Sequence, residues 1–416
     1  MGQFGIWGGS LLAWTLVLAT SSALEQWPQW RGPARDAHAV GFHAPPAWPT
    51  QFDERWQVEV GLGHSSPVVV AGKIYIFTRR GDDETLSCLN FSDGKPLWEK
   101  SYPAAYQVHP AAAAHGKGPK STPTVADSKV FTLGISGIVT CWNAKTGKVE
   151  WRRDFSKEFE KTSPLYGAAM SPLVDDKKCI VHVGGPDKGA LVALNVKNGD
   201  TIWTCNGDGP AYASPVIATI DDVRQVITQS QRAAIGVDAD DGKPLWKIPF
   251  QTEYDQNCVT PLVHEGSVVL SGINKGVSRY RIEKQDDEWG SDEIWQNKEV
   301  SSYTSSPVAV GERLFGFSHR QKGQLFAIDL TTGSTLWTSE GRLGDNASLV
   351  RAGNVLWALT TTGELIVFRD SDKQFDALAR YRVADTSTWA HPVILSTGVL
   401  VKDESKLHLW EIPKAQ

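Results

Sequence analysis

The residues of this chain that could carry out chemistry are numerous, but they do not form a recognised catalytic set. Ser, His and Asp are plentiful, yet no Gly-x-Ser-x-Gly nucleophile elbow is present. The five cysteines include no neighbouring pair and no Cys-x-x-Cys motif, which argues against a zinc site. His109 and His115 could ligate a metal, but a separation of six residues in an Ala-rich loop is a weak signal. We therefore predict no catalytic residue and no metal site.

A more regular set of polar residues marks the start of eight short apolar strands. Small hydroxyl groups fit where strands crowd an axis, and there they can bond backbone or water. The same groups could also face a ligand, and both roles stay open at this point. The residues at these openings are Ser66, Thr122, Ser171, Ser214, Thr260, Ser306, Ser348 and His391.

The elements that must position these residues follow from a second repeated feature. About thirty residues after each opening, a Gly-containing turn such as Ala144-Lys145-Thr146-Gly147-Lys148 leads into an aromatic residue. A repeat of about 42 to 53 residues built from short strands is typical of a β-propeller. The chain has 17 Trp, and large flat rings suit the gap between radially packed sheets. The repeated aromatic residues are Trp56, Trp98, Trp151, Trp203, Trp246, Trp295, Trp337 and Tyr381.

The ends of the repeat array predict how the ring closes. The last repeat supplies only three strands before the chain ends, whereas the segment 54–60 around Trp56 has no inner strands of its own. Pairing these two segments would leave no open ring end. We therefore predict an all-β fold, an eight-bladed β-propeller of four-stranded antiparallel blades, in which an N-terminal strand completes the last blade.

Three segments are predicted along the chain: a signal peptide at 1–23, an irregular N-terminal strap at 24–53 and the propeller at 54–416. The apolar run 6–19 and the small residues Ser21-Ser22-Ala23 fit export, with an uncleaved anchor as the alternative. After removal of the signal, we expect no membrane-spanning segment and a periplasmic or extracellular location. Net charge is −5 without a block of like charge, so we expect no nucleic-acid partner. The oligomeric state stays open.

The turn and Trp pattern, cleanest at Ala144-Lys145-Thr146-Gly147-Lys148-Val149-Glu150-Trp151, resembles the pyrroloquinoline-quinone-like (PQQ-like) propeller repeat. The resemblance covers residues 54–416. It implies either a quinoprotein dehydrogenase or a non-enzymatic propeller similar to the subunit of the outer-membrane β-barrel assembly machinery. The leader Trp27-Pro28-Gln29-Trp30-Arg31-Gly32-Pro33 additionally resembles secreted bacterial propeller proteins. That assembly subunit is lipid-anchored through a Cys, and this chain has none near the predicted cleavage site.

Resemblance to the dehydrogenases implies features that this chain does not show. They usually carry a vicinal cysteine pair over the quinone and an acidic cluster that holds Ca²⁺, and they are considerably longer. Here the closest cysteines, Cys179 and Cys205, are 26 residues apart. Asp255 is the nearest candidate for a general base, although a solvated loop acid is the simpler interpretation. We expect no cofactor, with PQQ and Ca²⁺ as the alternative.

Propeller geometry predicts one face for binding. Connections between blades share a face with the hairpins between second and third strands, and the two longest connections lie there. A concave opening with aromatic and polar groups is the default binding site. The candidates near the axis are His64, Ser66, His115, Lys120, Tyr166, Tyr212, Asn257, Tyr303, Asn346, Trp389 and His391. The hairpins of blades four to six add a basic arc, suited to an acidic partner, of Arg232, Lys275, Arg320 and Lys322.

These observations favour an exported, non-catalytic propeller that binds or scaffolds a cell-envelope protein. A PQQ-dependent oxidoreductase is one alternative, and a carbohydrate- or polymer-binding propeller is another.

Overall fold

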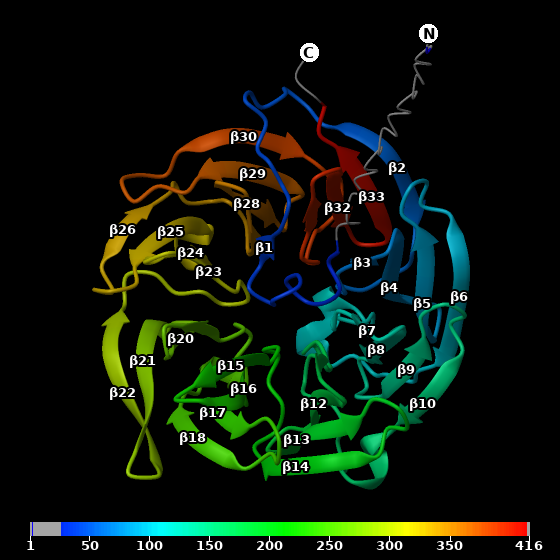
Figure 1. The fold of residues 1–416 in the computed structure, drawn as a ribbon, viewed down its shortest axis with the longest axis vertical. Coiled ribbons are helices and arrows are strands. Elements are labelled where there is room, and N and C mark those ends of the chain that lie inside the picture. The colour runs from blue at the N-terminus through cyan, green and yellow to red at the C-terminus, as the bar shows by residue number, and fades with distance from the viewer. Residues whose placement is uncertain (1, 3–25, 414–416) are drawn as a thin grey trace.

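The computed structural model describes Gly2 and residues 26–413. Eight sheets are arranged as blades around one axis, and the ring of blades is seen face-on in Figure 1. Seven sheets contain four strands each and one contains five. The predicted eight-bladed, nearly all-β propeller is confirmed. The predicted signal peptide lies outside the described residues except for Gly2.

In blades 1 to 6 the four strands follow one another in chain order, and the first strand lies innermost. Blades 1 and 2 consist of β3 (Val68–Val70), β4 (Lys73–Arg80), β5 (Asp83–Asn90), β6 (Pro96–Pro103), and β7 (Thr124–Ala126), β8 (Lys129–Leu133), β9 (Val139–Asn143), β10 (Val149–Arg153). Blades 3 and 4 consist of β11 (Leu173–Asp175), β12 (Lys178–Gly185), β13 (Lys188–Asn195), β14 (Thr201–Gly207), and β15 (Val216–Ile220), β16 (Val223–Gln229), β17 (Ala233–Asp238), β18 (Pro244–Pro249).

The second half of the ring repeats this plan. Blades 5 and 6 consist of β19 (Leu262–His264), β20 (Ser267–Gly272), β21 (Gly276–Gln285), β22 (Glu288–Asn297), and β23 (Val308–Val310), β24 (Arg313–Ser318), β25 (Gln324–Asp329), β26 (Thr335–Thr338). Blade 7 consists of β27 (Ala347–Ala352), β28 (Val355–Thr360), β29 (Glu364–Arg369) and β30 (Ala377–Arg382), with the short β1 (His38–Ala39) parallel to β27. Short 3-10 turns are η1 (Pro110–His115), η2 (Phe155–Lys157), η3 (Glu253–Asp255) and η4 (Arg320–Lys322).

Blade 8 closes the ring as the sequence predicts. It consists of β31 (Val393–Leu395), β32 (Gly398–Lys402), β33 (Lys406–Glu411) and, from the other end of the chain, β2 (Asp53–Glu59). Strand β2 pairs antiparallel with β33, so Glu54 lies opposite Trp410 and Glu59 lies opposite Lys406. Blade 8 therefore has four strands, and β2 covers the edge of β33 that would otherwise be open at the junction of the termini.

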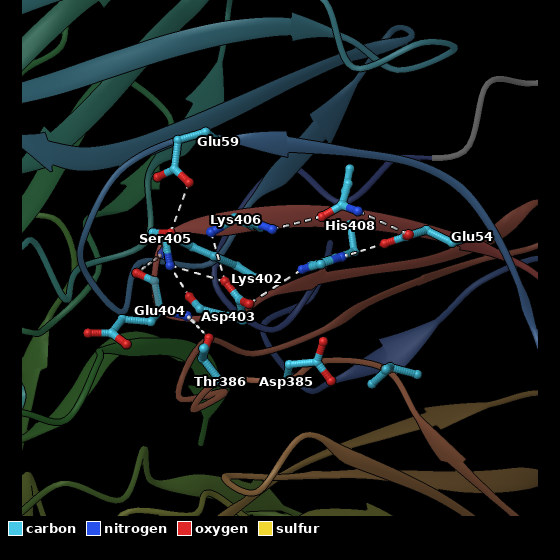
Figure 2. A network of polar contacts seen from close by, with 12 residues as sticks. Glu54, Glu59, Asp385, Thr386, Lys402, Asp403, Glu404, Ser405, Lys406 and His408 are labelled. Carbon is cyan, nitrogen blue, oxygen red and sulfur yellow. Dashed lines mark hydrogen bonds and ion pairs between the residues drawn. The ribbon is translucent and has the colours of Figure 1, made fainter.

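Polar side chains reinforce this closing seam (Figure 2). Nδ1 of His408 lies 2.6 Å from Oε1 of Glu54, and its Nε2 lies 3.5 Å from Oδ2 of Asp403. The hydroxyl of Ser405 donates to Glu59 across the same strand pair at 3.0 Å. Burial opposes protonation of His408, yet the two carboxylates outweigh it and raise the pKa of the imidazole.

The apolar core lies between successive blades, and the repeated Trp explains how each blade contacts the next. The indole of Trp151 in blade 2 packs on Gly199 in the β13–β14 turn of blade 3 and donates to the Val196 carbonyl at 3.1 Å. Gly199 has φ +75°, and a Cβ there would stand 2.8 Å from the indole ring. Glycine is therefore required both by the turn and by the ring that lies on it. The same contact recurs at Gly94, Gly147, Gly242 and Gly333.

Within residues 26–413, no helix combines the length and the apolar character needed to span a bilayer.

Candidate functional site

One face of the ring carries both the blade-to-blade connections and the hairpins between second and third strands. The backbone of Leu62, in the connection into blade 1, pairs with Arg79 at the β4–β5 hairpin. Lys117, in the long connection into blade 2, contacts Asp82 of the same hairpin at 2.6 Å. We call this side of the ring the cavity face, because the connections surround an opening on the axis.

The opening is a cavity of about 230 Å³ on the ring axis. Its wall is formed mainly by residues that immediately precede the inner strands. These residues converge because the eight inner strands surround one axis. The structure brings eight of the predicted residues together here: His64, His115, Lys120, Tyr166, Tyr212, Tyr303, Asn346 and Trp389. We refer to this opening as the axial cavity.

A chain of aromatic rings lines one side of the axial cavity. The ring centroids of Trp389 and His115 lie 5.1 Å apart, and those of His115 and Tyr166 lie 5.8 Å apart. Tyr166 in turn contacts Tyr212 edge-on at 5.9 Å. On the other side the Tyr303 hydroxyl bonds Oε1 of Gln256. Edge-to-face packing of this kind fixes ring orientation and leaves flat apolar surface toward the opening.

The charged groups of the axial cavity are unusual because one lysine ammonium is enclosed without a partner. Nζ of Lys120 makes no hydrogen bond to any described residue, and burial lowers the pKa of this amine to about 8. Nε2 of His64 is also unpartnered, and burial, followed by Lys120, lowers the pKa of this imidazole to about 3. Burial and then Lys120 likewise lower the pKa of His115. Near neutral pH the wall therefore encloses one ammonium beside two uncharged imidazoles.

The floor of the axial cavity comes from the strap, which we define as the described residues 26–52. Nε1 of Trp30 donates to the Thr260 hydroxyl at 3.1 Å, and the Trp30 ring packs edge-on against His391 at 5.4 Å. In Figure 1 this dark-blue segment crosses the centre of the ring. The cavity is therefore a cup with an indole at its base. The sequence signals this only weakly, through three Trp in a segment that lacks strand alternation.

Two buried arginines hold the strap in the channel. Arg35 donates to the carbonyls of Pro172 at 2.9 Å and Ser171 at 3.0 Å, and to the amide oxygen of Gln29 at 3.1 Å. Arg31 donates to the carbonyl of Pro307 on the opposite side of the ring. These guanidinium groups tie the strap to blades 3 and 6 through backbone carbonyls.

The hydroxyl residues at the strand openings form a belt between blades. The Ser66 hydroxyl accepts from the backbone amide of His391 at 2.7 Å, and the Ser66 amide donates to the Thr122 hydroxyl at 3.2 Å. Thr122 bonds Ser171 in the same way at 3.0 Å, and Ser171 bonds Ser214 at 2.9 Å. Each of these four hydroxyls thus satisfies a backbone donor of the neighbouring blade, and the openings Ser214, Thr260 and Ser348 also line the axial cavity. The structure places Ser66 in this belt and not on the cavity wall.

His391 and Asn257 are also placed in the interior. Both ring nitrogens of His391 lie 3.1 Å from backbone carbonyls, and burial lowers the pKa of this imidazole to about 3. The amide of Asn257 donates to the carbonyls of Ser230 and Phe250 at 2.8 and 2.7 Å and is consumed in ordering its loop. Its sequence neighbours Gln256 and Cys258 line the cavity instead.

The basic arc lies apart from the axial cavity. Arg232 forms an ion pair with Asp187, which belongs to the hairpin of blade 3 and partly neutralises the arc. Arg232 and Lys275 line a separate groove between blades 4 and 5. Arg320 donates to the carbonyl of Glu299 at 2.9 Å, and Lys322 follows it in η4. The four residues therefore do not converge on one ligand-sized site.

Potential metal ligands gather elsewhere. Among the described residues, the one group of three is His264, Glu265 and Glu312, on the side of the ring opposite the cavity face, and both glutamates are exposed. His109 instead caps η1, where its Nδ1 accepts from the Ala111 amide at 3.2 Å. His109 and His115 are not brought together as a ligand pair.

A closed ring of eight blades with Gly-turn and Trp contacts and an axial cavity defines a PQQ-like β-propeller. The family model described as "Outer membrane protein assembly factor BamB" matches residues 107–339, which is more than half of the chain. The protein belongs to this family.

Individual relatives show the extent of the similarity. The chain is 26% identical to the BamB of Yersinia pestis over 68% of this chain and 76% of that protein. It is 25% identical to the BamB of Shewanella oneidensis, but there the match spans only 56% of the relative. Subunit 1 of the methanol dehydrogenase of Methylorubrum extorquens is 29% identical over 38% of this chain and 26% of that subunit.

Solved structures agree on the fold alone, because their sequence identities are low. The crystal structure of BamB from Moraxella catarrhalis superposes with a TM-score of 0.63 and 15% identity, covering 86% of this chain and 99% of that chain. The quinohemoprotein alcohol dehydrogenase ADHIIG of Pseudomonas putida HK5 gives a TM-score of 0.66 and 13% identity, with 94% and 81% coverage.

The residues of the axial cavity do not fit a quinone held with Ca²⁺. Ca²⁺ is bound by six to eight oxygen ligands, usually with several carboxylates, whereas Asp345 supplies the one carboxylate of the described wall. The one thiol there is Cys258, whose pKa burial raises to about 12, and no second cysteine stands beside it. The cation of Lys120 would also repel a bound metal ion.

Proposed function

We propose that this protein is an exported, non-catalytic propeller that binds a cell-envelope protein through its cavity face, in the manner of an outer-membrane assembly factor. One observation carries the proposal. Three large apolar side chains stand exposed on blade-to-blade connections of this face: Leu62 at 47%, Leu165 at 40% and Tyr254 at 82%. Exposed apolar groups beside a polar rim are typical of protein interaction sites.

Tyr254 is the most informative of the three. It occupies η3 with φ +61°, a conformation that a bulky residue adopts only where the surroundings impose it. The connection that carries it also supplies Gln256 to the axial cavity. An exposed Tyr beside a concave opening has the character of an interface anchor, because it offers a large contact area and has few rotatable bonds.

The family relationship supports the identity of the partner class. The relatives that match are named as outer membrane protein assembly factors, and we therefore propose a component of that assembly process as the partner. The same proposal places the protein beyond the inner membrane, since an assembly factor for outer-membrane proteins acts there. A carbohydrate or other envelope polymer is the competing ligand for the same face, because aromatic walls also suit sugars.

Site-specific photocrosslinking tests the proposal. The photoreactive residue p-benzoylphenylalanine is placed at Tyr254 or at Leu165 in cells of the source organism, and crosslinked products are identified by mass spectrometry. Leu97 on β6 is the matched control, because it is equally exposed, at 51%, but belongs to the outermost strand of blade 1. We expect one envelope protein to crosslink from Tyr254 and Leu165 and not from Leu97.

Two results would overturn the proposal: crosslinks that arise equally from Leu97, or cavity-face positions that yield no protein product. A second function, quinone-dependent oxidation, is favoured only by the similarity to the methanol dehydrogenase subunit. It is tested by adding PQQ and Ca²⁺ to the purified protein and measuring bound chromophore and dye reduction with alcohols. Given the wall residues, we expect neither signal.

A further inference from the structure

Two lysines of this protein have an enclosed amine in different surroundings: Lys402 is buried as a whole, and Lys120 is half-buried with its Nζ enclosed. Nζ of Lys402, in β32, donates to the carbonyls of Gly63, Asp403 and Glu404 at 2.8, 2.9 and 3.1 Å. Nζ of Lys120 has no hydrogen-bond partner among the described residues. Burial lowers the pKa of both amines to about 8. Lys402 therefore shows how a structural lysine is accommodated in this fold, by hydrogen bonds to backbone carbonyls. Lys120 lacks such bonds.

The groups around Lys120 do not neutralise its charge. His64 and His115 lie beside it, and burial keeps both imidazoles uncharged near neutral pH. Asp345, from the connection into blade 7, is an acid of the same cavity but forms no ion pair with Lys120. A buried ammonium without an anion is costly. An unpaired ammonium in a concave aromatic wall indicates a binding site in which the ligand supplies the negative charge.

We propose that the axial cavity binds a small aromatic carboxylate, with the ammonium of Lys120 as the partner of the carboxylate group. The flat apolar body of the ligand would lie against Trp389 and Tyr166, and the indole of Trp30 would limit its depth. A single cation matches a single negative charge. This inference does not depend on the proposed envelope partner, because it concerns the purified protein and a small molecule.

The size of the cavity narrows the ligand class further. About 230 Å³ is below the roughly 300–1,000 Å³ of sites that hold drug-sized ligands, so one or two fused rings fit and larger systems do not. A phosphate ester is less suited than a carboxylate, since it carries up to two charges against one ammonium. The indole of Trp30 lies at the base of this cup, and the cup shape suits a compact molecule.

Isothermal titration calorimetry with 2-naphthoate tests the inference, with its neutral analogue 2-naphthamide as the chemical control. The purified full chain should bind naphthoate about tenfold or more tightly than naphthamide, a difference of about 1.4 kcal/mol. Lys120→Met should remove this preference, and Lys120→Arg should keep part of it. Lys117→Met is the matched protein control, because Lys117 lies in the same connection but is exposed and paired with Asp82.

Each possible result either supports or overturns the proposed role of Lys120. Loss of the preference for naphthoate in Lys120→Met, with full preference in Lys117→Met and an unchanged circular dichroism spectrum in both, supports the site. Equal binding of naphthoate and naphthamide by the unmodified protein overturns it. Retention of the full preference in Lys120→Met also overturns it, whatever the affinity, because the carboxylate would then be recognised elsewhere.

Discussion

The cations and indoles of the strap and those of the axial cavity are of similar types but differ in hydrogen bonding and exposure. We call these two regions the strap end and the cavity end of the ring axis. At the strap end, Arg31 and Arg35 are buried, but their guanidinium groups bond backbone carbonyls of the inner strands. At the cavity end, the ammonium of Lys120 is enclosed and bonds nothing among the described residues. Indole rings are enclosed at one end, as with Trp27, and partly exposed at the other, as with Trp389. Each guanidinium group has backbone partners although its Nε has none, whereas the Lys120 ammonium has no partner at all, and we interpret this difference as that between a structural group and a binding group.

The largest expected effect on stability distinguishes the indole of Trp27 at the strap end from the indole of Trp389 at the cavity end. Trp27→Ala should lower the free energy of unfolding by about 3–5 kcal/mol, because the ring is buried in the core and adjoins His391. Trp389→Ala should cost less than half as much stability but abolish naphthoate binding. Urea unfolding followed by circular dichroism measures the first effect and calorimetry the second. Equal stability losses would remove the contrast between the ends.

The second prediction compares the replacement of a cation by methionine at the strap end and at the cavity end. Arg35→Met leaves two backbone carbonyls without this donor and should destabilise the protein by about 2–3 kcal/mol. Lys120→Met removes an unpartnered buried charge and should stabilise it by about 1–2 kcal/mol. Thermal melting in the absence of ligand gives both signs. Destabilisation by Lys120→Met would show that the ammonium has a structural partner after all.

The pH dependence of stability sharpens the comparison. The folded pKa of Lys120, about 8, lies below the ordinary 10.5, so below pH 8 the charged amine destabilises the fold in full. Between about pH 8 and 10.5 the folded protein releases this proton while the unfolded chain keeps it, and stability rises. The advantage of about 1–2 kcal/mol of Lys120→Met should therefore fade over this window. The pKa values of His64 and His115, which share the cavity, are lowered from 6.5 and lie below this window.

The closing seam should show a smaller pH effect of opposite sign. The raised pKa of His408 means that its stabilising contribution is complete below the ordinary value of 6.5 and is lost as pH rises through the folded value. His408→Gln should cost about 1 kcal/mol at pH 6 and almost nothing at pH 9. Chemical denaturation at the two pH values measures the change. If the cost is the same at both pH values, the imidazole of His408 stabilises the seam by packing alone and its positive charge contributes nothing.

The fold was predictable because its signals are local and repeated. The Gly turn requires positive φ, the following Trp needs an apolar gap, and both recur at nearly constant spacing, as in Gly199 and Trp151. Ring closure followed from counting strands at the two ends of the chain. No long-range information was needed for either prediction.

The cavity wall was predictable only where each connection enters its strand in a regular way. Residues such as Tyr212 and Asn346 precede an inner strand by a fixed offset and reach the axis. Tyr212 and Asn346 stand two residues before the openings Ser214 and Ser348. The same offset before Thr260 gives Cys258, which lines the cavity, whereas Asn257 stands three residues before Thr260. Trp30 could not be placed from the sequence, since no periodicity links it to its partner Thr260, 230 residues away.

The pairing of β2 with β33 has a consequence for the synthesis of this protein. Glu59 and Ser405 are 346 residues apart, so the first strand of the ring waits for nearly the entire chain before it acquires its neighbour. Contacts of such long sequence separation form slowly. Until then the nascent protein keeps two open strand edges that can pair with other chains. A chaperone that covers β2 until β33 has been synthesised would protect the strand that waits longest for its partner.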